Sequence, residues 1–177
     1  MSLYLRLLWT LLRCWRGQRM DQCDTLERRM RVLPNDIDVN MHMNNGRYLT
    51  VTDLLLIEFF ARTGFLRLIP RQKWRPIAGG TIISFRRELK VLQPYTIRFW
   101  WTGSDKYWNY MRFDFLDLKG RICASGYTKG AFADRKGLVE NDRAYEALGY
   151  EKPDIELPDA VKRWQETQAL INKDAKI

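Results

Sequence analysis

The chain has 177 residues, of which 46% are hydrophobic and 29% charged, and its formal net charge is +9. These values are typical of one globular domain, and the positive charge favours an anionic ligand or membrane. No block of basic residues is regularly interleaved with aromatic residues, which argues against nucleic acid as a partner. A single histidine and three cysteines without ligand spacing argue against a zinc site and favour a reducing, cytoplasmic compartment.

The first 20 residues are predicted to form an amphipathic helical segment that precedes one domain at 21–177. Its apolar face is predicted to comprise Leu3, Leu7, Leu8, Leu11, Leu12 and Trp15, and its basic face Arg6, Arg13 and Arg16. The segment is too short and too charged to span a bilayer. Two interpretations remain open: residues 1–19 make a peripheral membrane contact, or the helix packs on its own domain or on a partner subunit.

A strand at Leu26–Leu33 is followed by the polar run Asp36–Tyr48, which contains the only histidine. The next segment, Tyr48–Thr63, is apolar on most sides and predicts a buried helix, capped by Asn44 or Asn45. Two carboxylates of this helix, Asp53 and Glu58, are expected on its most exposed strip.

A basic loop is predicted at Arg67–Arg75. Period-two alternation then indicates four antiparallel strands, at Thr81–Leu92, Tyr95–Thr102, Tyr107–Leu116 and Arg121–Phe132. Peripheral helices are expected at Asn141–Leu148 and Asp159–Asn172. This order of elements predicts an α+β protein whose sheet has an open edge.

Residues Asp38 to Tyr48 read Asp-x-Asn-x-His-x-Asn-Asn-x-x-Tyr without a gap. This run resembles the active-site signature of hotdog-fold thioesterases, and the plant acyl-carrier-protein thioesterases in particular. The resemblance covers roughly residues 25 to 172. It implies a hotdog fold, in which a curved antiparallel sheet wraps around a long central helix, here with peripheral N- and C-terminal helices. It also implies a homodimer or a dimer of dimers with the site at the subunit interface.

By this resemblance, Asp38 is the general base or nucleophile, assisted by Asn40 and His42. Glu88 matches a catalytic glutamate of the plant enzymes within Phe-Arg-Arg-Glu. Strand alternation, however, places Glu88 on the polar side of its strand, with Ser84 and Arg86, unless a bulge re-aims it.

The expected substrate-binding residues are Asn44, Asn45, Gly46 and Tyr48. Backbone N–H groups from Asn44 to Gly46 are expected to stabilise negative charge on the substrate oxygen. The implied activity is hydrolysis of an acyl-CoA or acyl-carrier-protein thioester, without a metal or other cofactor.

Two other functions remain open. The first is a catalytically weak, acyl-lipid-binding or membrane-associated hotdog protein. Some relatives lack an asparagine at the position of Asn40, so its presence here favours an enzyme. The second is a hotdog hydratase or dehydratase. Those enzymes carry Asp-x-Asn-Pro-x-His, whereas this chain lacks the proline and has His42 four residues after Asp38.

Overall fold

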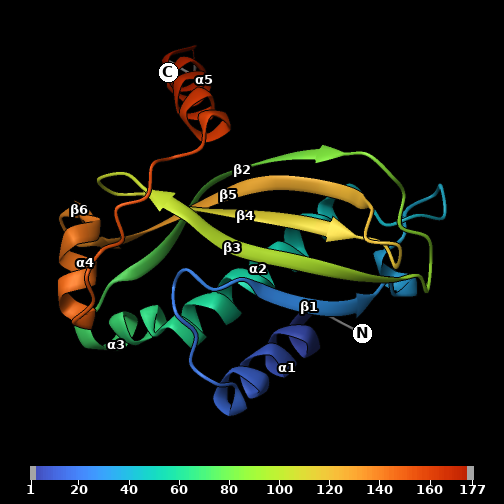
Figure 1. Cartoon of the computed structure of the whole chain (residues 1–177), viewed down its shortest axis with the longest axis horizontal. Helices are drawn as coiled ribbons and strands as arrows, with labels where there is room; N and C mark the ends of the chain where they lie inside the picture. Colours follow the sequence, from blue (N-terminus) through green and yellow to red (C-terminus); the bar gives the residue numbers. More distant parts are fainter. Residues whose placement is uncertain (1–2, 175–177) are drawn as a thin grey trace.

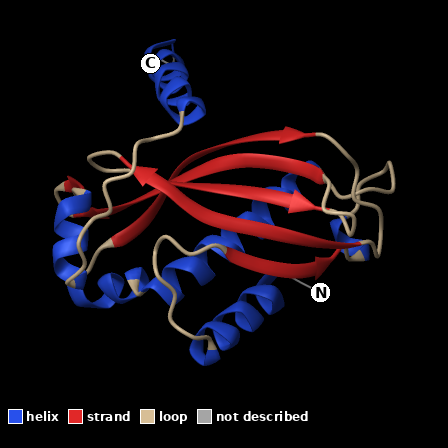
Figure 2. Cartoon of the chain, in the orientation of Figure 1, coloured by secondary structure: helices blue, strands red, loops and turns tan. Residues whose placement is uncertain are grey.

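The computed structural model describes residues 3–174, with backbone only for residues 3, 4, 15 and 16 of the first helix. One curved antiparallel sheet and five α-helices make up these residues (Figures 1 and 2). The helices are α1 (Leu3–Arg16), α2 (Asn45–Thr63), α3 (Leu68–Gln72), α4 (Asn141–Leu148) and α5 (Asp159–Asp174). The strands are β1 (Leu26–Arg31), β2 (Arg75–Phe85), β3 (Pro94–Ser104), β4 (Asn109–Leu116), β5 (Ile122–Asp134) and β6 (Gly137–Leu138). The strand order is β1-β3-β4-β5-β2, with β6 paired to β5.

The sheet curves around α2, which confirms the predicted α+β hotdog fold (Figure 1). Aromatic rings from both layers form the core. The helix α2 contributes Tyr48 and Phe59, and the sheet contributes Phe99, Phe113 and Phe115. Asn44 caps α2, and Gly64 ends it in the left-handed conformation that glycine adopts without a steric penalty. The long helix is therefore held in place at both ends.

The opposite face of the sheet is partly covered by α5. Val161 and Trp164 of α5 pack against Tyr110 and Tyr127 of β4 and β5, forming a smaller second apolar cluster. The predicted C-terminal helices both exist, and that at Asn141–Leu148 has the predicted bounds.

Two predicted elements differ from the structure by more than their end residues. The stretch Arg67–Arg75 was predicted to be a loop, but it contains α3. The strand predicted at Thr81–Leu92 begins at Arg75 and ends at Phe85. It ends early because the N–H groups of Arg86 and Arg87 both bond to the Cys123 carbonyl, at 2.7 and 3.0 Å. Two residues then oppose one, which is the arrangement of a β-bulge.

The N-terminal helix α1 packs against α2 through the side that carries Arg6. The Arg6 guanidinium is buried and lies 2.5 Å from a carboxylate oxygen of Asp36, which is 1% exposed. Arg6 therefore faces the domain, whereas Leu8, Leu11 and Leu12 face outward. None of the helices in the described part of the chain is long and apolar enough to cross a bilayer.

Candidate functional site

The loop before α2 is a narrow hairpin closed by backbone bonds. Ile37 pairs with Met43, and the Asp38 N–H donates to the His42 carbonyl at 2.9 Å. The turn requires a left-handed conformation at Met41, whose φ is 62°. The Asn40 N–H donates to Oδ1 of Asp38 at 2.8 Å, so one carboxylate oxygen stabilises the turn.

The second carboxylate oxygen of Asp38 faces the histidine. Its Oδ2 lies 3.4 Å from Nδ1 of His42, and both side chains are partly exposed. The hairpin therefore brings together the carboxylate and the imidazole of the sequence motif, while leaving both accessible to a ligand. Asn40 lies on the exposed side of the turn, where its backbone rather than its amide contacts Asp38.

The N-terminus of α2 has fewer available donors than the sequence predicted. Asn44 acts as the cap: its Oδ1 accepts from the Gly46 N–H at 2.9 Å, and its carbonyl accepts from the Arg47 N–H. The Asn44 N–H itself donates to the Asp36 carbonyl at 2.8 Å. The N–H groups of Asn44 and Gly46 are therefore already used within the hairpin and the cap. The Asn45 N–H has no hydrogen bond to any described residue, and Asn45 is exposed.

A pocket of about 260 Å³ lies beside this helix end. It is lined by His42, Met43, Asn45, Tyr48, Phe85, Arg86, Arg87 and Glu88. The segment after β2 runs along the hairpin, since the Met43 N–H donates to the Leu89 carbonyl at 2.8 Å and His42 forms a bridge to Lys90. The pocket therefore joins the motif to the Phe-Arg-Arg-Glu segment, which lies far from it in the sequence.

Glu88 is exposed, as strand alternation predicted, and it also lines the pocket beside the motif. The predicted strand ends before Glu88, so alternation along β2 does not apply to it. The bulge at Arg86 and Arg87 turns the chain, and Glu88 lines the same pocket as His42. A bulge was the one condition under which the sequence placed Glu88 near the site.

Tyr48 lies at the base of this pocket. Its ring packs edge-on against Phe85 and Phe115, with centroid distances of 5.1 and 4.8 Å. Burial raises the pKa of the Tyr48 phenol to about 12, so the group stays protonated at neutral pH. Tyr48 therefore supplies an apolar wall and cannot act as a base near neutral pH.

The two acidic residues within α2 lie in different environments. Glu58 is buried and paired with Arg28, with Arg62 3.9 Å away, which contradicts the prediction that it is exposed. Asp53 does lie on the exposed strip, with Asn45 and Leu49, although nearby atoms desolvate it enough to raise its pKa. Within residues 3–174, no group of three or more His, Cys, Asp or Glu side chains has the arrangement of a metal site.

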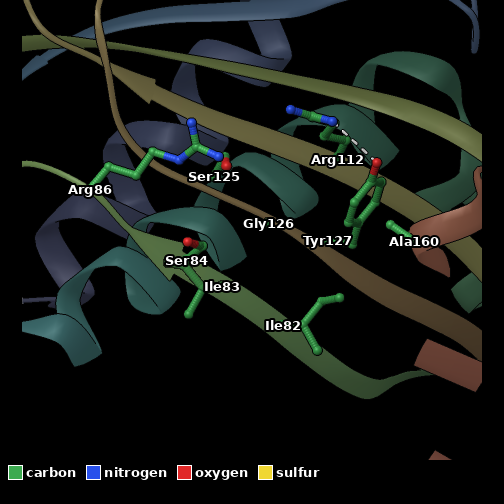
Figure 3. A pocket seen from close by; sticks show the side chains of 9 residues that line it. All are labelled: Ile82, Ile83, Ser84, Arg86, Arg112, Ser125, Gly126, Tyr127 and Ala160. Atoms are coloured by element: carbon green, nitrogen blue, oxygen red, sulfur yellow. Dashed lines mark hydrogen bonds between the residues drawn. The ribbon is translucent and has the colours of Figure 1, made fainter. Parts of the chain in front are cut away.

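A second pocket, of about 340 Å³, lies on the outer face of the sheet (Figure 3). Residues of β2, β4 and β5 form it together with Ala160 of α5, and Arg112 donates to the Tyr127 hydroxyl at 3.2 Å within it. Arg86 lines both pockets. No Asp, Glu, His or Cys side chain lines this second pocket, so the groups capable of acid–base chemistry gather in the first.

The fold and the hairpin at the N-terminus of its central helix define a hotdog protein of the thioesterase type. Residues 32–165 match the model of the thioesterase-like superfamily, and the chain belongs to that superfamily.

Two relatives and one solved structure illustrate the similarity. Protein THEM6 of Xenopus laevis is 26% identical over 136 residues, which cover 75% of this chain and 63% of that protein. Thioesterase lcsJ of Purpureocillium lilacinum is 32% identical over 133 residues, covering 61% of this chain and 42% of that protein. The matched parts thus span less than two thirds of these relatives. The DHNA-CoA thioesterase of Staphylococcus aureus superposes with a TM-score of 0.62 at 12% identity, covering 86% of this chain and 97% of that one.

Proposed function

We propose that the protein hydrolyses acyl thioesters and that its substrate is an acyl-CoA. The observation that carries this proposal is the partly exposed Asp38 carboxylate, which lies 3.4 Å from His42. His42 lines the same pocket as Asn45, whose N–H has no hydrogen bond to any described residue. Hydrolysis of a thioester needs a base or nucleophile together with a donor where negative charge develops on oxygen. Both groups occur here, next to a pocket.

Asp38 acts as the general base in the proposed reaction. Its Oδ2 removes a proton from water as the water oxygen bonds to the carbonyl carbon of the thioester. The carbonyl oxygen becomes negatively charged and accepts a hydrogen bond from the Asn45 N–H, where the α2 dipole is favourable. Collapse of this intermediate breaks the carbon–sulfur bond, and the thiolate takes up the proton from Asp38. A direct attack by Asp38 would instead form an anhydride, which water then hydrolyses.

The other motif residues have supporting roles in this proposal. His42 orients Asp38 through Nδ1 and lines the pocket into which the substrate fits. Glu88, which is exposed, lines the same pocket and would hold the attacking water. Asn40 and Asn44 shape the hairpin and the helix cap, and Gly46 donates to that cap. Asn45 and Tyr48 line the pocket that would receive the reacting carbonyl.

Positive charge near the pocket supports an anionic substrate. Arg86 and Arg87 line its mouth, and both are exposed. Guanidinium groups suit phosphate oxygens, which coenzyme A carries. The S. aureus protein of similar fold acts, by its name, on a CoA thioester.

The direct test is thiol release from a panel of acyl-CoAs and of the same acyl groups on acyl carrier protein. Hydrolysis of acyl-CoA well above the rate without protein is expected. Faster hydrolysis of the carrier-protein substrates would assign that substrate class instead. Binding without turnover would identify the weak acyl-lipid-binding alternative, and hydration of an enoyl-CoA would identify the hydratase.

Replacing His42 by alanine is expected to lower turnover, by less than loss of the Asp38 carboxylate does. The imidazole contacts Asp38 through one nitrogen, whereas the carboxylate performs the proton transfer itself. Thiol-release kinetics and thermal unfolding should be measured together. Unchanged turnover with a lower Tm would show that His42 has only a structural role.

We also propose a homodimer, or a dimer of dimers, that covers this site. The outer edge of β2 pairs with no strand of the described chain, so a second copy can continue the sheet there. Large apolar side chains surround the open site, including Val39, which is 95% exposed, together with Met41 and Phe85. Such exposure is typical of an interface.

Val39→Asp is expected to weaken the dimer by about tenfold or more, because an unpaired carboxylate would be buried at the interface. Light scattering over a concentration series measures this change. The matched control is Ile171→Asp on α5, where the side chain is also exposed. A monomeric wild-type protein at micromolar concentration would contradict the proposed assembly.

The proposed location is the cytoplasm, with peripheral membrane contact through residues 1–19. Residues 1–20 would then serve as a contact segment for the thioesterase domain at 21–177. The outward-facing leucines of α1 support this proposal.

A further inference from the structure

A basic pocket of about 550 Å³ lies between α1, β1 and the C-terminal half of α2. Arg13, Arg28 and Arg62 line it, one from each element. Glu58 is the carboxylate that pairs with Arg28 and lies 3.9 Å from Arg62. Arg13 forms no ion pair with any described residue. Three guanidinium groups thus line the pocket, and Glu58 neutralises the charge of one of them.

The positive charges of Arg13 and Arg62 act on the third guanidinium group, that of Arg28. The pKa of Arg28 is lowered, first by burial and then by the charges of Arg13 and Arg62. Arg62 is held in position because its Nε donates to the Gln18 carbonyl at 2.9 Å. A bound anion would relieve this repulsion, and it would find two of the guanidinium groups, those of Arg28 and Arg62, already held in position.

The pocket opens beside the apolar face of α1. Trp9 and Leu12 form its rim, and the same face continues to Leu8 and Leu11. Trp9 is 60% exposed, and the other three are also exposed. The buried pair of Arg6 and Asp36 fixes the helix so that this face points away from the domain. A leucine- and tryptophan-bearing face beside arginines is the pattern of a helix that lies in a membrane interface.

We propose that α1 rests on an anionic membrane and that Arg13, Arg28 and Arg62 bind the phosphate of a lipid phosphomonoester headgroup. The inference extends the membrane contact proposed above and names its ligand. Charge selects the phosphomonoester, because its second negative charge matches the two guanidinium charges that Glu58 leaves uncompensated. The apolar rim selects a lipid over a free phosphate, since acyl chains would contact Trp9 and Leu12 as the headgroup enters.

Co-sedimentation of the full chain with three kinds of vesicle tests this inference. The vesicles contain phosphatidylcholine alone, with phosphatidylserine, or with phosphatidic acid, and the two anionic vesicles are matched for surface charge. The wild-type protein is expected to bind phosphatidic acid vesicles several-fold more tightly than phosphatidylserine vesicles. It is not expected to bind vesicles of phosphatidylcholine alone. Its affinities for both kinds of anionic vesicle should fall as the salt concentration rises.

Arg13→Gln is the variant that addresses the pocket, because Arg13 is exposed and supports no fold contact through an ion pair. About a fivefold loss of phosphatidic acid binding is expected, with a smaller effect on phosphatidylserine. Arg163→Gln on α5 removes the same charge at an exposed remote position and should change neither affinity by more than about twofold. Hydrolysis of a soluble acyl-CoA should be unaffected by Arg13→Gln. Leu12→Ser should weaken binding to both anionic vesicles.

Four outcomes would overturn the inference. Equal losses on both anionic vesicles would leave a general membrane contact and remove the lipid-specific pocket. Equally tight, Arg13-dependent binding of glycerol 3-phosphate in solution would assign the pocket to a free phosphate. Absence of vesicle binding at low salt would contradict the proposed membrane contact. The proposed thioester hydrolysis is tested separately, by thiol release. A larger oligomer that Leu12→Ser dissociates would show that a second copy of the chain occupies the face.

Discussion

Asp38→Asn is expected to lower turnover on the preferred acyl thioester by about 100-fold or more, the range for loss of a general base. Asparagine has the same shape, and its carbonyl oxygen can still accept the Asn40 N–H that Oδ1 of Asp38 accepts at 2.8 Å. The hairpin should therefore remain intact while the second oxygen, which faces His42, is replaced by an amide nitrogen that cannot take up a proton. Single-turnover and steady-state thiol release would both report the loss.

The matched control is Asp142→Asn, which removes a carboxylate that is 75% exposed and far from the site in the sequence. It should leave turnover unchanged. Thermal unfolding of both variants establishes that they are folded. Near-native turnover of a folded Asp38→Asn protein would remove Asp38 from the mechanism, and Glu88 would become the next base to test, since it lines the same pocket as His42.

Asp36→Ala is expected to destabilise the protein by about 3 kcal/mol or more. Asp36 is 1% exposed, pairs with the buried Arg6 and accepts the Leu33 N–H at 3.0 Å. Removing it would leave the Arg6 guanidinium buried without a counter-charge, which costs more than the loss of an exposed pair. Urea unfolding followed by tryptophan fluorescence measures the change in free energy.

Asp142→Ala provides the comparison for this experiment, because it breaks an exposed pair with Lys152 and is expected to cost at most about 1 kcal/mol. If Asp36→Ala cost no more than this control, α1 would not be fixed to the domain by Arg6. The outward direction of its leucine face would then lose its structural explanation.

Local pattern was sufficient for most of the fold. The alternation of Tyr95, Ile97, Phe99 and Trp101 predicted the buried side of β3, and those four side chains are buried. Asn44 and Gly64 marked the ends of α2 because a cap and a left-handed terminator depend on short-range chemistry. The motif from Asp38 to Tyr48 was sufficient to place a carboxylate and an imidazole together, since a hairpin between them is itself a local structure.

The rest depended on contacts between segments that are distant in the sequence. Strand alternation did not bring Glu88 to the pocket beside His42, because the Cys123 carbonyl, on another strand, accepts two successive N–H groups and ends the strand before Glu88. The pairing of Asp36 with Arg6, thirty residues earlier, decided which face of α1 is buried. Burying a carboxylate without a counter-charge costs more free energy than leaving leucine side chains exposed to solvent. Local patterns therefore determined the elements and the motif, whereas tertiary contacts determined which groups of the motif are free to act and which side of α1 faces outward.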